Sequence, residues 1–348
     1  MKEKIMVAMS GGVDSAVSAH LISERHEAAG VTMRLFGEEL GLPPSPEASK
    51  AAAVCAQMGI PHFVADLTDS FRREVIDPFI KAYESGLTPN PCVFCNKALK
   101  FGALLDFAKA NGYARIATGH YARIEKSSSG RYLLRRAADL TKDQSYMLYS
   151  LSQEVLSSVD LPLGSLTKNE VRAIAAELQF PMAEQKDSQD ICFIPDGDYV
   201  AFIERITDKK PIPGNFISTE GTVMGEHRGT LCYTIGQRKG LGVSWSEPLY
   251  VLRKSVAENT VTLGSNNELF EKRLTAHSIN LIPFDTLDAP RRLLAKIRYR
   301  QEATPARVEQ IAPDRVVVEF EAPQRAISPG QSLVLYDGDY VVGGGIID

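Results

Sequence analysis

The sequence lacks the features that would assign it to several large classes of protein. No apolar run approaches the roughly 20 residues that a membrane-spanning helix needs, and neither a hydrophobic leader nor a small-residue cleavage site follows Met1. The 348 residues include only 5 cysteines, an odd number that argues against a disulfide framework and for reduced thiols. We therefore expect a cytoplasmic protein with no membrane anchor.

A strong charge of either sign is also missing. The formal net charge is −4, which does not indicate a nucleic-acid binder, although a local basic face is compatible with it. The hydrophobic fraction of 44% and the charged fraction of 24% are ordinary for a globular protein. Because the chain is too long for one compact core, its length predicts two or three domains.

The first half of the chain alternates strand-like and helix-like segments. Short apolar runs predict strands, and apolar residues at helical spacing predict helices. In chain order these are a strand over residues 5–9, a helix over 13–26, a strand over 30–36, a helix over 47–58, a strand over 61–65, a helix over 98–110 and a strand over 114–118. Thr167 and Glu170 form a capping box that begins a further helix. This order predicts an α/β fold, with a parallel sheet covered by helices on both faces.

The second half has a different texture. From about Pro211, glycine and proline become frequent, and short β-branched runs replace the helices. These runs predict strands over residues 260–263, 307–309, 315–320 and 332–336, and Asp337-Gly338 predicts a hairpin turn. We therefore expect an α/β domain over 1–205, followed by two small β-rich domains over 206–272 and 273–348.

The loop Ser10-Gly11-Gly12-Val13-Asp14-Ser15 lies between the first predicted strand and the first predicted helix. Two glycines let backbone N–H groups approach phosphate oxygens, and the helix N-terminus adds partial positive charge. The alternative is a tight turn with Asp14 and Ser15 as helix caps. No Gly-Lys-Ser/Thr follows, and the Gly-x-Gly-x-x-Gly dinucleotide pattern is absent. The loop resembles the pyrophosphate loop of the ATP pyrophosphatase superfamily, whose members transfer AMP from ATP to an oxygen. Asp14 is expected to orient the loop or to reach a magnesium ion.

Three cysteines are candidates for chemistry. Cys92 and Cys95 form a Cys-x-x-Cys pair in a Pro-rich loop entering a helix, where a thiolate is expected to be stabilised, and Cys192 lies far along the chain. A structural zinc site is the alternative, but it needs four ligands, and neither a second such pair nor paired histidines occur. Cys55 and Cys232 are expected to be core thiols.

Six strings together resemble the bacterial tRNA-specific 2-thiouridylases nearly from end to end. They are residues 10–15, 88–96, 118–123, 142–146, 188–194 and 233–241. The resemblance implies an N-terminal domain like the adenine nucleotide α-hydrolases and a C-terminal β-barrel. It also implies the activity: ATP adenylates the 2-oxo group of the wobble uridine in tRNA, and a persulfide sulfur then displaces AMP. A cysteine desulfurase or a sulfur-relay protein would supply the sulfur to a monomeric enzyme that also uses Mg²⁺.

The resemblance also implies residue roles. Cys192 would bear the persulfide and Cys95 would attack it, so that the two end as a transient disulfide. The positions implied to surround ATP are Ala8, Met9, Ser10, Gly11, Gly12, Val13, Asp14, Ser15, Met33 and Gly119. Those implied to meet tRNA are Asn90, Pro91, Cys92, His120, Lys142, Asp143, Gln144, Arg298, Tyr299 and Gln331. No residue is implied to be a metal ligand.

Residue type alone gives some of these positions ordinary roles. Lys142 and Arg298 would then be solvated surface charges, His120 a buried hydrogen-bonded histidine, and Asp143 and Gln144 parts of a turn. Two departures from the family pattern also stand out. Many members have Asp where this chain has Cys92, and the stretch over 36–48 is short and lacks the expected cysteine and acidic residues.

Three other functions remain open at this point. Cys92, Cys95 and Cys192 could hold a [4Fe–4S] cluster with one open iron, although three thiolates leave it one ligand short of the usual four. An amide ligase acting on a small molecule would share the phosphate loop but would need no cysteine. A tRNA-binding module without catalysis would leave the phosphate loop unexplained.

Overall fold

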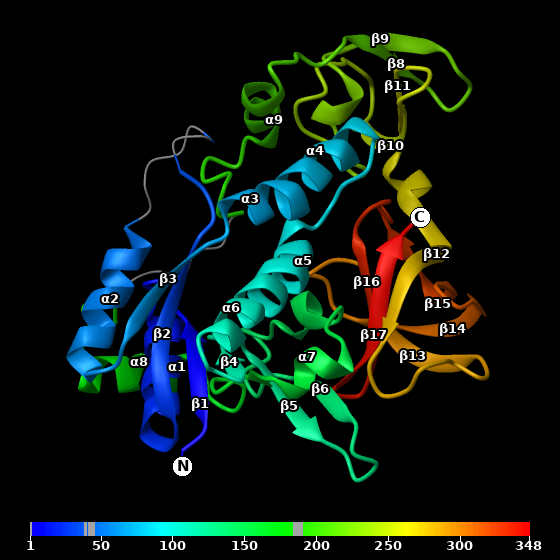
Figure 1. Cartoon of the computed structure of the whole chain (residues 1–348). Coiled ribbons are helices and arrows are strands. Elements are labelled where there is room, and N and C mark those ends of the chain that lie inside the picture. Colours follow the sequence, from blue (N-terminus) through cyan, green and yellow to red (C-terminus); the bar gives the residue numbers. More distant parts are fainter. Residues whose placement is uncertain (1, 38–39, 41–45, 184–190) are drawn as a thin grey trace.

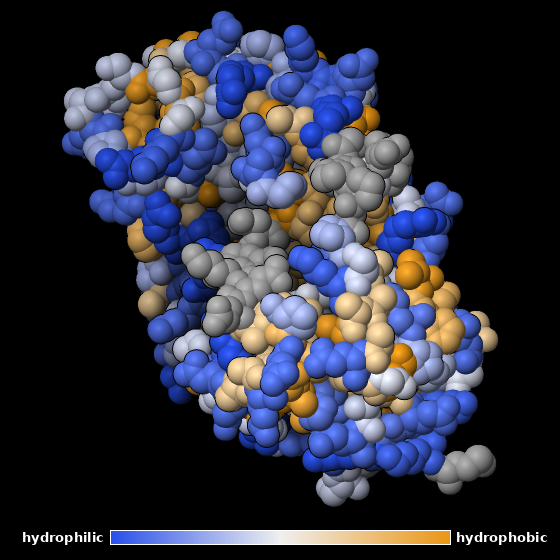
Figure 2. Space-filling view, turned by 90° about the vertical axis from the view of Figure 1, so that its left-hand side faces the viewer, coloured by the Kyte–Doolittle hydropathy of each residue, from blue (hydrophilic) through white to orange (hydrophobic). Residues whose placement is uncertain are grey.

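The computed structural model describes residues 2–37, 40, 46–183 and 191–348 (Figure 1). Most of the predicted loop over 36–48 and residues 188–190 of one family-like string lie outside these ranges. Within the described ranges, no helix combines the length and the apolar character that a membrane crossing requires. Hydrophilic and hydrophobic residues are interspersed over the face of the molecule that Figure 2 shows.

A five-stranded parallel sheet forms the centre of the N-terminal domain, and its strand order is β3-β2-β1-β4-β7. Side chains of β1 alternate between two hydrophobic clusters, with Ile5 and Val7 in one and Met6 in the other, as a strand covered on both faces requires. The parallel sheet predicted from the alternating pattern is confirmed. The strands are β1 (Lys4–Ala8), β2 (Glu27–Arg34), β3 (His62–Asp66), β4 (Arg115–Ala117) and β7 (Val159–Asp160).

Helices cover both faces of this sheet (Figure 1). One face packs against α1 (Val13–Arg25), α2 (Glu47–Met58) and α8 (Lys168–Glu177). The other face packs against a helical rod made of α5 (Pro91–Cys95), the π-helix η3 (Asn96–Ala103) and α6 (Leu104–Ala110). The helix predicted over 98–110 was therefore placed seven residues too late. It begins at Pro91 with the short α5, and the π-helical η3 then interrupts the α-helical period before α6.

A second group of helices packs around an aromatic cluster. These are α3 (Thr68–Phe71), η2 (Arg72–Ile76), α4 (Asp77–Glu84) and α9 (Tyr199–Thr207). The ring of Phe193 lies edge-on to those of Phe71 and Phe79, with centroids 5.6 and 5.4 Å apart. Because Cys95 belongs to the same cluster, the segment around Phe193 is packed against the helix that carries this cysteine.

The middle of the chain forms a small sheet of order β10-β11-β8-β9 with its own core. Its strands are β8 (Gly214–Ile217), β9 (Val223–His227), β10 (Tyr250–Ser255) and β11 (Thr260–Gly264), accompanied by the short helices η5 (Thr230–Cys232) and η6 (Asn266–Leu269). The strand predicted over 260–263 is confirmed.

The last part of the chain is a closed six-stranded antiparallel barrel, in which β12 pairs with β17 to complete the circle. The strands are β12 (Phe270–Leu281), β13 (Arg291–Lys296), β14 (Thr304–Ala312), β15 (Arg315–Arg325), β16 (Ser332–Asp337) and β17 (Tyr340–Ile347). The expected C-terminal barrel is confirmed.

A hairpin of the N-terminal half joins this barrel. It consists of β5 (Ala122–Lys126) and β6 (Tyr132–Arg136), and β6 pairs with β17 at Arg135 and Tyr340. The short helices η4 (Ser145–Leu148) and α7 (Gln153–Ser157) follow, and Tyr146 donates a hydrogen bond to the carbonyl of Ser332 (2.7 Å). The hairpin and η4 thus connect the parallel sheet to the barrel.

Candidate functional site

The loop after β1 is held in shape by Ser15. The Ser15 hydroxyl donates to the carbonyl oxygen of Gly12 (2.9 Å) and accepts from the backbone N–H of Ser10 (3.2 Å). The loop therefore closes directly onto the first turn of α1. This geometry presents a helix N-terminus at the carboxyl edge of a parallel sheet, which is a favourable position for an anionic group.

Glycines let neighbouring segments approach this loop closely. Gly11 has φ of 71°, and a Cβ there would lie 3.1 Å from the Cβ of Lys50 and 3.2 Å from the carbonyl oxygen of Glu47, at the start of α2. A Cβ on Gly119, just after β4, would lie 3.0 Å from the carbonyl carbon of Asp14. Met33 is in β2, beside β1. The ten positions implied to surround ATP therefore gather at the carboxyl ends of three adjacent strands.

Asp14 is engaged inside the protein. Both of its carboxylate oxygens lie 2.8 Å from the ammonium of Lys168, which begins α8, and the hydroxyl of Tyr121 donates to one of them (2.7 Å). Lys168 is buried, with 7% of its surface exposed. Of the two roles expected for Asp14, orienting the loop fits these contacts. Holding a magnesium ion does not fit, because both carboxylate oxygens already face an ammonium group.

Three thiols lie in one electrostatic neighbourhood. Negative charge on Cys95 or Cys92 raises the pKa of Cys192, and the positive charge of Lys100, in η3, lowers it. The carboxylate of Glu47, whose backbone borders Gly11, also raises the pKa of Cys192. The structure thus brings Cys192 to the pair in α5 and to the edge of the phosphate loop, and all three thiols are free. In the described part of the chain, no group of three His, Cys, Asp or Glu side chains is arranged to hold a metal ion, so the cysteines do not fit a cluster in this arrangement.

The expected stabilisation of thiolates at the helix start is wrong. Loss of hydration raises the pKa of Cys92 and of Cys95, and the positive charge of Lys100 offsets only part of this rise. Cys92 and Cys192 present part of their surface to solvent, yet protein atoms crowd the Cys192 thiol enough to raise its pKa to about 12. Desolvation therefore outweighs the helix dipole, and at neutral pH all three groups are thiols.

This pKa predicts how Cys192 reacts with iodoacetamide. Since only the thiolate reacts and the pKa is about 12, its rate should rise about tenfold per pH unit, or about a hundredfold between pH 8 and pH 10. An ordinary thiol such as glutathione, measured in the same buffers as a control, should level off above pH 9 and gain about tenfold or less. Mass spectrometry of the peptide containing Cys192 measures the rate. A plateau near pH 9 for this peptide would contradict the raised pKa.

His120 follows Gly119, which borders the phosphate loop at Asp14. Its Nδ1 is 2.7 Å from the hydroxyl of Thr118, and its ring contacts that of Phe101 at a centroid distance of 5.6 Å. Burial lowers its pKa well below the usual value, and the positive charge of Lys100 lowers it further. His120 is therefore neutral at physiological pH. Its hydrogen bond fits the residue-type interpretation, and its implied contact with tRNA stays a prediction.

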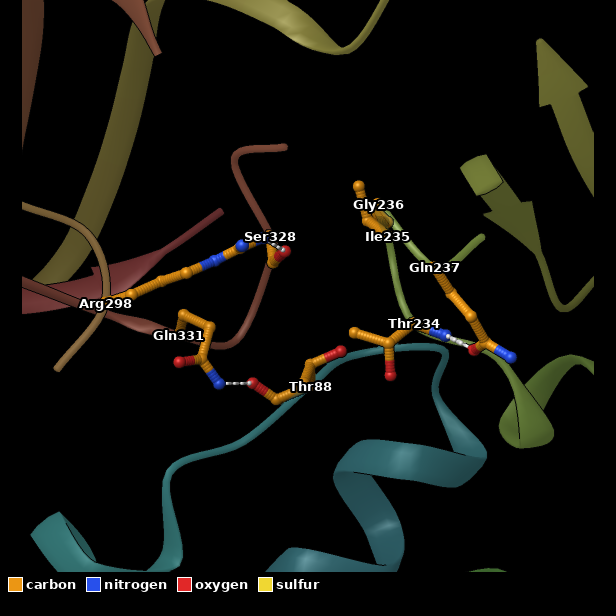
Figure 3. A pocket seen from close by; sticks show the side chains of 8 residues that line it. All are labelled: Thr88, Thr234, Ile235, Gly236, Gln237, Arg298, Ser328 and Gln331. Carbon is orange, nitrogen blue, oxygen red and sulfur yellow. Dashed lines mark hydrogen bonds between the residues drawn. The ribbon is translucent and has the colours of Figure 1, made fainter. Parts of the chain in front are cut away.

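A cavity of about 380 Å³ lies where the three parts of the chain meet, and Figure 3 shows the side chains around it. Gln331 of the barrel donates to the carbonyl oxygen of Thr88 (2.7 Å), just before α5. Arg298 donates to the carbonyl oxygen of Ala326 (2.5 Å) and to the Ser328 hydroxyl (3.1 Å), so it is not a purely solvated surface charge. The cavity is lined by Thr88, Thr234, Ile235, Gly236, Gln237, Arg298, Ser328 and Gln331.

The other implied tRNA positions lie around η4. The carboxylate of Asp143 accepts from the N–H and the hydroxyl of Ser145 (3.2 and 2.8 Å), which is the turn role that its residue type predicts. Gln144 accepts from the N–H of Tyr121 (3.0 Å). Tyr299 donates to the carbonyl oxygen of Asp143 (3.2 Å), and negative charge on Cys92 raises the pKa of Tyr299. Lys142 is partly exposed beside them.

Asn90 and Pro91 complete the start of α5. The amide of Asn90 donates to the sulfur of Met147 (3.6 Å), and Pro91 is buried. Their positions bring the first turn of α5 against η4, so Asn90, Pro91 and Cys92 lie together beside Tyr299.

Sequence reasoning missed several residues of the site. Lys168, which lies between the two capping-box residues Thr167 and Glu170, had no expected role, and neither had Lys100 or Tyr121. Tyr121 could have been found as a member of the string over 118–123. Lys168 gave no signal, because it meets Asp14 only after two distant helices have packed. Lys100 lies on the same helical rod as Cys92 and Cys95, a relation hidden while these cysteines were assigned to a loop.

Three family models match the chain in succession. They are a tRNA methyl transferase HUP domain over residues 3–196, a tRNA methyl transferase PRC-barrel domain over 200–265 and an aminomethyltransferase beta-barrel domain over 271–347. Together they follow the sheet, the small middle sheet and the closed barrel described above.

Curated relatives match over nearly the whole chain. The tRNA-specific 2-thiouridylase MnmA of Acetivibrio thermocellus is 45% identical, covering 99% of each chain. The protein of the same name from Clostridioides difficile is 44% identical over 100% of this chain and 99% of its own. The one from Heliobacterium modesticaldum is 47% identical over 100% and 93%.

Proposed function

The chain belongs to the family of tRNA-specific 2-thiouridylases, and we propose that it uses ATP to replace the 2-oxygen of a tRNA wobble uridine with sulfur. It is an ATP-dependent sulfurtransferase that acts on tRNA. The observation that carries the site assignment is that Glu47 links the phosphate loop to the thiols. Its backbone borders Gly11 of the loop, and its carboxylate raises the pKa of Cys192, which lies near Cys92 and Cys95.

In the first step the uridine O2 attacks the α-phosphorus of ATP, and pyrophosphate leaves. The backbone of residues 10–15 and the start of α1 would hold the phosphates. Lys168 neutralises Asp14, so that this carboxylate does not repel them. The uridine oxygen, otherwise a poor leaving group, leaves in the next step as part of AMP. Asp14 is engaged by Lys168 and Tyr121, so no step is assigned to a magnesium ion held by this carboxylate.

In the second step the terminal sulfur of a persulfide on Cys192 attacks C2 of the uridine, and AMP leaves. Cys95 then attacks the Cys192 sulfur, and the sulfur bound to C2 departs from the enzyme as 2-thiouridine. A disulfide between Cys95 and Cys192 forms in the same event, so two electrons must be returned before the next turnover. Lys100, whose charge acts on all three thiols, would stabilise the anionic sulfur during these transfers.

The tRNA would lie across the junction of the three parts of the chain. Asn90, Pro91 and Cys92, at the start of α5, would meet the target base beside Cys95. Arg298 and Gln331 at the junction cavity, with His120, Tyr299 and residues 142–144 around η4, would contact the rest of the anticodon arm. The base must leave its stack to reach the thiols, which costs a few kcal/mol and less in a single-stranded loop.

Sulfur would come from a cysteine desulfurase or a sulfur-relay protein. The part of Cys192 exposed to solvent gives such a donor access. We infer a cytoplasmic location, because that is where the tRNA substrate and such donors are found. We also infer that the enzyme is a monomer.

The test is thiolation of an unmodified tRNA transcript with ATP and a sulfur source. The expected products are 2-thiouridine at the wobble position, AMP and pyrophosphate, made by iron-free enzyme. AMP formation that needs a small amine instead of tRNA would indicate the ligase, and tRNA binding without AMP would indicate the non-catalytic module. Activity that appears only with bound iron and sulfide would replace the persulfide with a cluster.

A further inference from the structure

Cys92 is the thiol that the two steps above leave without a chemical role. It lies in the first turn of α5 with one side open to solvent. Its nearest thiol neighbour along the chain, Cys95, is 9% exposed and packs in the aromatic cluster with Phe79 and Phe193. One helix therefore carries an accessible and an inaccessible thiol.

The spacing of these two cysteines suits a disulfide. Residues three apart in an α-helix lie on the same face, with Cα atoms about 5 Å apart. Disulfides join Cα atoms that are about 4.4–6.8 Å apart, so Cys92 and Cys95 can bond with only a local adjustment of side chains. Because Pro91 begins the helix and η3 continues it, this turn is fixed between rigid neighbours.

The same thiols lie around the place where the disulfide of the proposed reaction forms. Negative charge on Cys92 or Cys95 raises the pKa of Cys192, and negative charge on Cys92 also raises the pKa of Cys95. A disulfide between Cys95 and Cys192 would block both the sulfur carrier and its partner nucleophile. The Cys95 half of it would be buried, whereas the Cys192 half and the neighbouring Cys92 both present part of their surface to solvent.

We propose that Cys92 resolves this disulfide by thiol exchange, an inference that rests on the proposed function. The Cys92 thiolate attacks the sulfur of Cys95, a bond between Cys92 and Cys95 forms, and Cys192 leaves as a thiolate that takes up a proton. Cys192 is then free to receive the next persulfide. A dithiol protein of the thioredoxin class, approaching the exposed Cys92, supplies the two electrons that return Cys92 and Cys95 to thiols.

This role differs from proton transfer, which an aspartate at this position could perform. A carboxylate at this position can transfer a proton near the base, whereas a thiol with an ordinary pKa of about 8.5, against about 3.9 for Asp, is a poor substitute at neutral pH. An aspartate cannot take part in thiol exchange. The two residues therefore make opposite predictions for the variant Cys92→Asp.

The test follows the disulfides formed per 2-thiouridine. Enzyme carrying a persulfide on Cys192 is mixed with ATP and tRNA transcript without reductant, quenched with an alkylating agent and mapped by mass spectrometry. In the wild type we expect about one disulfide between Cys92 and Cys95 per 2-thiouridine, with Cys192 alkylated. In Cys92→Ser each 2-thiouridine formed, whatever the total yield, should leave Cys95 bonded to Cys192. A disulfide joining Cys95 or Cys92 to Cys192 in the wild type would overturn the proposal.

A second measurement uses turnover. With a limiting thioredoxin-class reductant, the ratio of the second-turnover rate to the first-turnover rate should fall at least tenfold in Cys92→Ser and Cys92→Asp. An excess of a phosphine reductant should restore that ratio in both. Cys232→Ala, which removes a buried thiol of the middle domain, is the matched control and should keep the wild-type ratio. A full wild-type ratio in Cys92→Asp under limiting reductant would assign Cys92 to proton transfer instead. Absence of 2-thiouridine in the wild type would contradict the proposed function itself.

Discussion

Replacing Cys95 by serine should lower the formation of 2-thiouridine by at least about a thousandfold, while AMP and pyrophosphate are still made. Serine has nearly the volume of cysteine and fits the same helix, but its hydroxyl is not a nucleophile without an activating base. The phosphate loop contains none of the cysteines, so adenylation does not depend on them. Product nucleosides measured by mass spectrometry, together with AMP release, check both halves of the expectation.

The same variant should leave a trace on the enzyme. Sulfur supplied to Cys95→Ser should remain on Cys192, because the thiol that attacks the persulfide is missing, whereas Cys192→Ser should carry no sulfur at all. Cys232→Ser, at a buried thiol of the middle sheet, is the control and should thiolate tRNA normally. Normal thiolation by Cys95→Ser would rule out its role as the partner nucleophile.

Replacing Lys168 by methionine should raise the KM for ATP about tenfold to a hundredfold and destabilise the fold by about 2 kcal/mol. Breaking a buried ion pair costs about 3–5 kcal/mol, and the partial exposure of Asp14 reduces that value. The side chain of Asp14 is 31% exposed, against 8% for Lys168. Without the ammonium, a negative carboxylate in the first turn of α1 faces the incoming phosphates. Steady-state kinetics and thermal unfolding measure the two effects.

The companion variants separate charge from packing. Asp14→Asn combined with Lys168→Met removes the repulsive charge as well, so it should recover a large part of the KM while keeping some loss of stability. Lys4→Met breaks the exposed ion pair with Glu27 (2.9 Å) and should change neither quantity. If Lys168→Met kept the wild-type KM, Lys168 would be only a structural residue.

The parts of the site that could be predicted from sequence are those built from contiguous residues. The loop over residues 10–15 is local, since strand, glycines and helix follow one another, and the sheet follows from the alternating pattern. The start of the helix at Pro91 was missed because α5 has only 5 residues, and η3, which follows it, winds with a π-helical period in which the usual apolar spacing fails. The pairing of Lys168 with Asp14 joins residues 154 positions apart, and no local pattern signals such a contact.

The electrostatics of the thiols could not be predicted either. Cys92 occupies a helix start, which by itself lowers a thiol pKa, yet packing around it reverses the sign. Desolvation depends on every element that packs against a group, here including the segment around Phe193 from another part of the chain. The sequence indicates which residue types can react, but the charge state of each side chain depends on how the folded chain packs around it.

The hairpin β5–β6 has a consequence for how the molecule unfolds. Tyr146 and Tyr149 of the N-terminal half share one hydrophobic core with Val334, Tyr336 and Val341 of the barrel. The backbone N–H of Arg136 also donates to the carbonyl oxygen of Asp339 (2.9 Å), which continues the barrel sheet into the hairpin. A barrel cut away at its first strand would expose that core on both fragments. We therefore expect the first and last modules to unfold together. The middle sheet has a core of its own and a smaller contact with the barrel through Leu252, Leu269 and Ala326.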